Sequence, residues 1–152
     1  MSNKLGLNYK QAWTGFFLAY DKLTKEIDRR MRDAGVVSLD VYDVLLILEI
    51  SPDRKMKMSD LANEVLRSMS GATRAAERLE KEGLIVREAS KEDRRVVYAH
   101  ITDKGVAERV RAWPVYELGI KELFADQMTV AEAVNLAAIF GRIRPLPDYL
   151  SS

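Results

Sequence analysis

One segment constrains the fold of this chain more than any other. Residues 66–105 read LRSMSGATRAAERLEKEGLIVREASKEDRRVVYAHITDKG. In the first half, apolar and small residues recur at steps of three and four, the repeat of one face of an α-helix. Gly83 follows, at a position where glycine commonly ends a helix because it enters the left-handed conformation without a Cβ penalty. The second half holds two stretches that favour strands, residues 84–89 and 96–101, separated by a charged turn. This order predicts a helix followed by a β-hairpin.

The predicted helix has two different sides. Its apolar side is narrow and small enough to pack closely on a neighbouring helix; it carries Met69, Ala72, Ala76 and Leu79. Its other side is polar and carries Ser70, Thr73, Arg74, Glu77 and Lys81. Ser68 is placed to cap the helix, since its hydroxyl can accept a hydrogen bond from an unpaired N–H of the first turn.

A shorter helix is expected just before it, over residues 59–66. We expect Ser59 to cap this helix and its inner face to consist of Leu61, Ala62 and Val65. Only Arg67 and Ser68 remain for the turn between the two helices. Two short helices joined this tightly form a helix-turn-helix, which presents its second helix to the major groove of DNA.

The turn of the hairpin is strongly charged. It reads Ser-Lys-Glu-Asp-Arg-Arg over residues 90–95. Lys91, Arg94 and Arg95 at a hairpin tip suit contact with phosphates or entry into a minor groove. Asp93 is placed to pair with Arg95 and to fix its direction before DNA binds.

These residues resemble the MarR family of winged-helix transcriptional regulators. The family signature Asp-Arg-Arg, a short strand and then Leu-Thr-x-x-Gly has its counterpart in Asp93-Arg94-Arg95 followed by Ile101-Thr102-Asp103-Lys104-Gly105. Thr73-Arg74 and residues 79–84 are similar to the recognition helix of the family and its exit. Val96 and Ile101 depart conservatively from the usual residues and leave the predicted wing intact.

Pattern and resemblance together indicate one set of DNA-contacting residues. The expected contacts are Ser68, Ser70, Gly71, Thr73, Arg74, Arg78, Lys91, Asp93, Arg94 and Arg95. The competing interpretation is a solvated helix face and an ordinary soluble hairpin tip. Lys55 and Lys57 precede the first helix of the pair and could also touch phosphate, although a charged loop explains them more simply.

The rest of the chain is predicted to be helical. Helices are expected over residues 8–33, 38–50, 102–124 and 129–144. Asn8 with Gln11, and Thr129 with Glu132, fit the capping-box pattern at two of the helix starts. The predicted fold is therefore mainly α with a small β-hairpin. A winged helix-turn-helix lobe, residues 35–105, is flanked by a helical dimerisation region formed by residues 1–34 and 106–152.

The terminal helices carry more apolar residues than one chain can readily cover, so we expect a homodimer. A dimer would place two recognition helices roughly 34–36 Å apart on a pseudo-palindromic site. The resemblance implies a small aromatic or anionic lipophilic effector bound near these helices. Candidate lining residues are Trp13, Phe17, Tyr20 and Tyr42, for which a place in the core or the dimer interface is the simpler alternative.

Composition limits the remaining possibilities. The chain has no cysteine, which excludes disulfides and cysteine-based redox sensing. It has no apolar run near the ~20 residues of a membrane span, and residues 1–10 lack the apolar core of a secretory signal, so a cytoplasmic protein without a membrane partner is expected. The net charge is only +1, and residues 67–95 carry eight basic against six acidic residues, so composition alone does not indicate nucleic acid.

No catalytic or metal-binding constellation is evident, and His100 is the one histidine. We therefore expect neither an enzyme nor a bound cofactor. The leading hypothesis is a ligand-responsive, dimeric repressor that binds double-stranded DNA at a pseudo-palindromic operator. The alternative is a winged-helix protein-interaction module that does not bind DNA, which the near-neutral charge favours.

Overall fold

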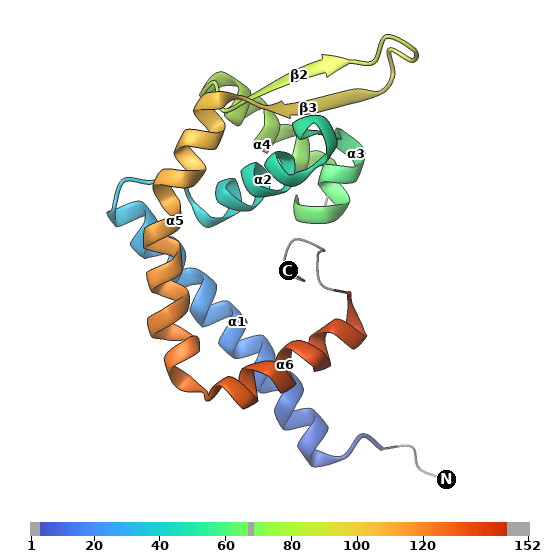
Figure 1. Ribbon diagram of the computed structural model, residues 1–152. Coiled ribbons are helices and arrows are strands. Elements are labelled where there is room, and N and C mark those ends of the chain that lie inside the picture. The colour runs from blue at the N-terminus through green and yellow to red at the C-terminus, as the bar shows by residue number, and fades with distance from the viewer. Residues whose placement is uncertain (1–3, 67–68, 146–152) are drawn as a thin grey trace.

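The computed structural model describes residues 4–66 and 69–145, with residues 65, 66 and 69–73 described through their backbone only. A winged lobe of short helices and a small sheet sits at one end of two long helices that lie side by side (Figure 1). The sheet hairpin extends beyond this lobe, and the last helix leaves the long pair at its far end.

Long helices form the body. They are α1 (Leu7–Asp33), α5 (Asp103–Leu123) and α6 (Val130–Ile143), with η3 (Ala125–Gln127) between the last two. The winged lobe contains α2 (Leu39–Ile50), η1 (Pro52–Arg54), α3 (Met58–Leu61), the π-helical turn η2 (Ala62–Leu66) and α4 (Met69–Lys81). This order matches the prediction from periodicity.

The sheet has one strand more than the predicted hairpin. β2 (Ile85–Ala89) and β3 (Val97–Ile101) are the expected pair, and β1 (Lys55–Lys57) adds to the other edge of β3, so the antiparallel order is β1-β3-β2. The expectation of a charged loop at Lys55 and Lys57 was therefore wrong. A three-residue Lys-Met-Lys strand is too short to give a periodic signal, and its pairing partner lies more than forty residues away in the sequence.

Two buried clusters hold the molecule together. The first joins α2, α4 and the sheet and includes Leu45, Leu48, Leu61, Leu79 and Ile85, all exposed by no more than 1%. The second lies where α1 and α2 meet α5; it contains Ile27, Met31, Leu39, Tyr42 and Ala112. Because α2 contributes to both clusters, it connects the winged lobe to the long helices.

Helix starts agree with the sequence at some positions and not at others. Thr129 and Glu132 form the predicted capping box, with both hydrogen bonds present. The predicted Asn8 capping box is wrong, because α1 starts one residue earlier with Gly6 at its N-cap and no side-chain cap. Ser59 does not cap its helix either, since α3 starts at Met58 and Lys57 occupies the N-cap position.

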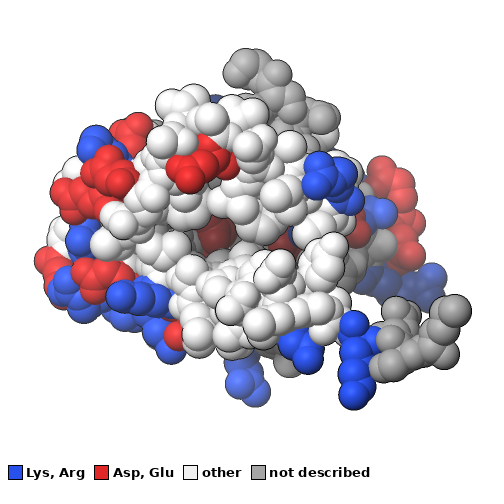
Figure 2. Space-filling view, turned by 90° about the horizontal axis from the view of Figure 1, so that it is seen from below, with Lys and Arg blue, Asp and Glu red and all other residues white. Residues whose placement is uncertain are grey.

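Large apolar side chains remain uncovered on the terminal helices. Trp13 and Phe17 on α1 and Val130, Val134 and Ile143 on α6 are all more than 60% exposed. Seen from the side of these helices, the surface is mainly uncharged, with charged residues gathered around its edge (Figure 2). Among the described residues, no single helix is long and apolar enough to cross a membrane; the segments Asp103–Gln127 and Val130–Ile143 meet that test only as a pair bent by 104°.

Candidate nucleic-acid interface

Helix α4 has the two sides that the sequence predicts. Ala76 and Leu79 are buried against the lobe, whereas Arg74, Glu77 and Arg78 are exposed. Ser70, Gly71 and Thr73 lie on the first turns of this helix, and Ser68 falls outside the described residues. Two exposed arginines therefore share one helix with the predicted polar residues of its N-terminal half.

The end of α4 is fixed by backbone hydrogen bonds. Gly83 has a φ of +74°, its N–H donates to the Glu80 carbonyl at 2.9 Å, and the Leu84 N–H donates to the Leu79 carbonyl at 2.9 Å. This is a Schellman ending, in which the left-handed residue is usually glycine and apolar residues on either side meet. Leu79 and Leu84 are both buried, so α4 ends at a defined place in the core.

The first turn of α5 is attached to the same ending. The Thr102 hydroxyl donates to the Gly83 carbonyl at 2.7 Å and accepts from the Gly105 N–H at 3.0 Å. The Lys104 ammonium donates to the Glu82 carbonyl at 2.7 Å, which places a cation at the negative end of the α4 dipole. Helix α4, the hairpin and α5 thus meet at one junction.

The hairpin tip has an ordered turn. Ser90 N–H donates to the Val96 carbonyl at 2.8 Å, and Val96 N–H donates to the Asp93 carbonyl at 2.9 Å. The Asp93 carboxylate accepts from the Arg95 backbone N–H at 3.0 Å and from its Nε at 3.2 Å, which confirms the predicted pair. These hydrogen bonds lower the pKa of Asp93. The Arg95 side chain is still 92% exposed, so the pairing directs it without covering it.

The other predicted tip residues lie beside this pair. Lys91 and Arg94 are exposed, and the tip stands clear of the body of the lobe (Figure 1). The structure therefore gathers the predicted residues into two groups, one on α4 and one at the hairpin tip, both on the winged lobe. Sequence reasoning missed the side-chain contact between Glu80 of α4 and Arg87 of β2, because it depends on how the helix packs against the strand.

The four candidate ligand residues are not gathered in one place. Trp13 lines an apolar cavity of about 700 Å³ between α1, α6 and the winged lobe. Phe17 and Tyr20 are on α1 but are not among the residues that line this cavity. Tyr42 is only 2% exposed and packs in the second core cluster, with its ring centre 4.9 Å from that of Tyr116.

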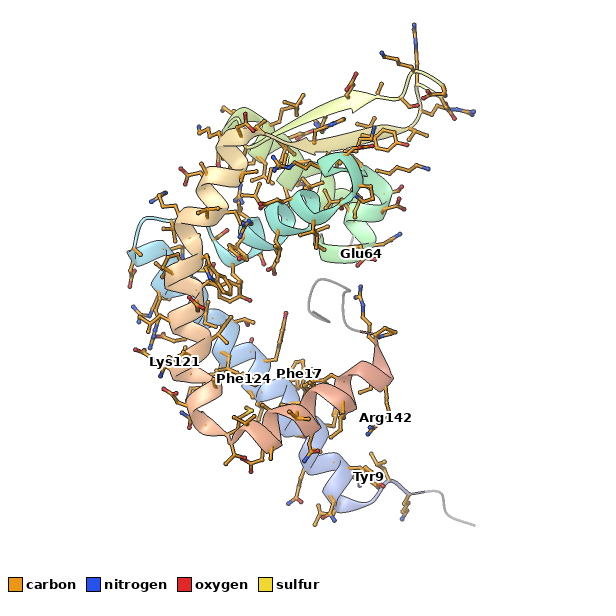
Figure 3. All side chains as sticks on the ribbon, viewed as in Figure 1. Tyr9, Phe17, Glu64, Lys121, Phe124 and Arg142 are labelled. Carbon is orange, nitrogen blue, oxygen red and sulfur yellow. The ribbon has the colours of Figure 1, made fainter. Side chains whose placement is uncertain are left out.

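Both the terminal helices and the winged lobe line this cavity. α1 and α6 contribute Tyr9, Phe16, Phe140 and Ile143, and the winged lobe contributes Ile47 and Glu64. Glu64 points from the lobe toward α6 (Figure 3), where its carboxylate accepts from the Arg144 guanidinium at 2.6 Å. Among the residues that the structure describes, no cluster of histidine and acidic side chains suits a metal ion.

Comparison with known proteins agrees with this geometry. Residues 38–97, from the start of α2 to the start of β3, match the model of the MarR family. The winged lobe is therefore similar to that of the MarR-family regulators. The match includes the helix-turn-helix and the Asp-Arg-Arg tip, whereas Ile101–Gly105, the second half of the signature on which the resemblance rested, lies beyond it.

Curated relatives of the chain are transcription regulators. It is 33% identical over 69 residues to the uncharacterized HTH-type transcriptional regulator YkoM of Bacillus subtilis, which is 45% of each chain. It is 31% identical over 84 residues to the transcriptional repressor MprA of Escherichia coli, which is 55% of this chain and 47% of MprA. The chain thus spans about half the length of these two relatives. Both relatives are described as transcription regulators, and neither description names an enzymatic activity.

A solved structure extends the likeness to nearly the whole chain. Sco3205, a MarR family transcriptional regulator from Streptomyces coelicolor crystallised in complex with DNA, superposes with a TM-score of 0.83. The match covers 94% of this chain and 89% of Sco3205 at 28% identity. The winged-helix fold with long flanking helices is therefore that of the MarR regulators.

Proposed function

We propose that this protein is a sequence-specific DNA-binding transcriptional regulator. The observation that carries the proposal is the exposed Arg95 side chain, held by Asp93 at the tip of a hairpin on the same lobe as the polar side of α4. The likeness to Sco3205, which was crystallised with DNA, supports it. Such a regulator has to reach the chromosome, so we place its action in the cytoplasm.

In this proposal the two groups of residues contact adjacent grooves of one duplex. Helix α4 enters the major groove, where Arg74 and Arg78 can bond to guanine edges or phosphates. Polar and small residues at its start approach the backbone; these are Ser68, Ser70, Gly71 and Thr73. Arg95 enters the minor groove and Lys91 and Arg94 meet phosphates, because a narrow minor groove attracts arginine.

The functional unit we propose is a homodimer. Residues 35–105 form the DNA-binding lobe, and residues 1–34 and 106–152 form the dimerisation region. Support comes from the exposed apolar side chains of α1 and α6, which a second copy would cover. A two-fold dimer would bind a pseudo-palindromic operator, with recognition helices roughly 34–36 Å apart.

The last part of the proposal is that the protein represses transcription and that a small-molecule effector relieves the repression. The relative MprA is described as a transcriptional repressor. The apolar cavity near Trp13 has room for a small aromatic or lipophilic anion, and it is bounded by both the terminal helices and the winged lobe. An effector that binds more tightly to one arrangement of these parts would shift the protein away from its DNA-binding shape.

Selection of bound sequences from a random DNA library, followed by titration at several salt concentrations, tests the proposal. We expect enrichment of a pseudo-palindrome and an affinity that falls steeply with salt, because phosphate contacts release counterions. Arg95→Ala should weaken binding by about 1–3 kcal/mol. Lys25→Ala, an exposed lysine of α1, is the matched control and should leave binding unchanged.

The alternative is a winged-helix module that binds a protein instead of DNA. The net charge of +1 favours it, since many DNA-binding domains are strongly basic. No enriched sequence at low salt, together with one stoichiometric protein partner in a pull-down, would replace the DNA-binding proposal with this one.

A further inference from the structure

Glu80, near the end of α4, holds Arg87 of β2 with three hydrogen bonds. Its carboxylate accepts from the Arg87 backbone N–H at 3.1 Å, from Nε at 2.9 Å and from a terminal guanidinium nitrogen at 2.8 Å. Both side chains are about one-third exposed, at 36% for Glu80 and 28% for Arg87. The contact is therefore better ordered than a solvent-exposed ion pair with a single hydrogen bond.

This contact crosses the joint between the two elements proposed to bind DNA. Helix α4 ends at Lys81 and strand β2 starts at Ile85, so only residues 82–84 connect them. The Schellman hydrogen bonds fix the backbone on the helix side of this joint, and Glu80 ties the helix to the third residue of the strand. Its carboxylate bonds to both the backbone and the side chain of Arg87, and thereby restrains the direction in which the hairpin leaves the helix.

A neighbouring ion pair is much looser than the contact between Glu80 and Arg87. Arg78 on α4 and Glu82, the first residue after that helix, approach only to 3.9 Å, and both are more than half exposed. That pair does not reach the strand, so it fixes no angle between the helix and the hairpin. The backbone hydrogen bond from Arg87 and then the guanidinium lower the pKa of Glu80, so the carboxylate is charged wherever the protein is folded at neutral pH.

We propose that Glu80 is a positioning residue that sets the angle between the recognition helix and the wing, so that Arg74 and Arg95 reach adjacent grooves of the same duplex together. The inference rests on the proposed DNA binding and adds a residue that touches no DNA itself. Without the Glu80 carboxylate, the hairpin samples other directions, and docking of both elements has to select the right one at a cost in affinity.

Glu80→Gln tests this role because geometry and charge predict opposite results. Removing a negative charge from a DNA-binding lobe by itself strengthens binding to a polyanion. A positioning role predicts instead that affinity for the selected operator falls about tenfold, the scale of a lost charge-assisted hydrogen bond. Glu77→Gln, the same change at an exposed position one turn earlier, is the control and should bind as tightly as the wild type or more tightly.

Hydroxyl-radical footprinting gives the readout that a general loss of stability would not produce. In Glu80→Gln we expect protection of the minor groove under the wing to weaken, while protection around the α4 half-site stays. Arg87→Lys keeps the positive charge but lacks the planar fork that bonds through two nitrogens, so it should give the same partial footprint. Urea unfolding of each variant shows whether it is folded under the binding conditions.

Two outcomes would separate the inference from the proposed function. If the wild type binds its operator and Glu80→Gln binds as tightly as Glu77→Gln with a complete footprint, Glu80 has no positioning role. If the wild type enriches no DNA at all, the proposed function fails, and this inference fails with it. A tenfold loss accompanied by a uniformly weakened footprint would also overturn the positioning role, because it would indicate a general loss of the folded lobe.

Discussion

At the residue scale, Gly105 is the described glycine with the least room for a side chain. A Cβ built there would lie 2.3 Å from the Leu84 carbonyl oxygen and 2.7 Å from an Ile101 side-chain carbon. Because the first obstacle is backbone, the neighbour cannot turn away as a flexible side chain would. Glycine is thus required in the first turn of α5 by close approach, independently of its φ angle.

We predict that Gly105→Ala lowers the free energy of unfolding by about 1–3 kcal/mol, the usual cost of overpacking. Urea denaturation followed by circular dichroism measures it. Gly15→Ala is the control, since a Cβ there meets nothing within 4 Å and the position is helical; it should stabilise the protein by about 0.5–1 kcal/mol. Equal stability of the two variants would show that the junction tolerates a methyl group.

Asp43 on α2 is a half-buried carboxyl group whose pKa is raised to about 6. Burial is the main cause, and the nearby charge of Asp40 adds to it. The folded state therefore holds the Asp43 proton more tightly than the unfolded chain does. It follows that burial of this group does not lower the free energy of unfolding at low pH. Its destabilising effect grows as the pH rises from about 4 to about 6.

Asp43→Asn should consequently stabilise the protein at pH 7.5 by about 1–3 kcal/mol and have much less effect near pH 4. The measurement is urea unfolding of variant and wild type at several pH values, and the informative quantity is their difference. A difference that is constant with pH would contradict the raised pKa.

At the element scale, a polar contact joins α2 to α5. Arg109 of α5 pairs through two nitrogens with Glu49 near the end of α2, and its third nitrogen donates to the Tyr42 hydroxyl at 3.4 Å. The side chains of Arg109 and Glu49 are only 17% and 20% exposed. The contact therefore contributes to the angle between the winged lobe and the long helices.

Glu49→Gln should lower the free energy of unfolding by about 1–3 kcal/mol, because it leaves a partly buried guanidinium without its carboxylate. Glu108→Gln breaks a pair with Arg111 that lies within one helix and nearer to solvent, so it should cost less than about 1 kcal/mol. Thermal and urea unfolding compare the two. If both changes lower the free energy of unfolding equally, the contact between α2 and α5 stabilises the protein no more than an ion pair within one helix.

Local patterns in the sequence predicted the elements well, and contacts between distant segments were missed. Thr102 and Thr129 were expected to start helices and do so, because a cap involves residues three positions apart. The capping predictions for Asn8 and Ser59 failed, because each of the two helices begins one residue before the predicted cap. β1 was missed because the partner strand stabilises it and its own sequence does not.

The same distinction holds for the candidate site. The Asp93–Arg95 pair was predicted because it spans two residues within one turn. The Glu80–Arg87 contact was not predicted, since it depends on how separate elements pack. Tyr42 lies in the core, which was the simpler of the two interpretations given for it. Ser68 lies outside the described residues, and its predicted role as a helix cap stays a prediction.

At the scale of the whole molecule, the uncovered apolar side chains of α6 are the surface that the proposed dimer would bury. Val134 is 62% exposed on α6, and Val86 is 51% exposed on β2 of the wing. A charge placed inside a dimer interface carries a large desolvation penalty, whereas the same charge on a free surface carries little.

Val134→Asp should therefore convert the proposed dimer to monomer at micromolar concentration, as sedimentation velocity would show. It should also reduce affinity for a full palindrome to about that for a half-site. Val86→Asp is the control and should stay dimeric. A wild-type protein that sediments as a monomer would contradict the dimer directly.

The pair formed by Glu64 and Arg144 has a consequence for how easily the molecule changes shape. It joins the π-helical turn before α4 to the end of α6, both residues line the apolar cavity, and their side chains are 43% and 70% exposed. Solvated pairs of this kind contribute about 0–1 kcal/mol. Loss of this pair alone would therefore change the equilibrium between arrangements with and without the Glu64–Arg144 contact by no more than about fivefold. An effector of the kind proposed above would therefore need to prefer an arrangement without this contact only slightly in order to offset it.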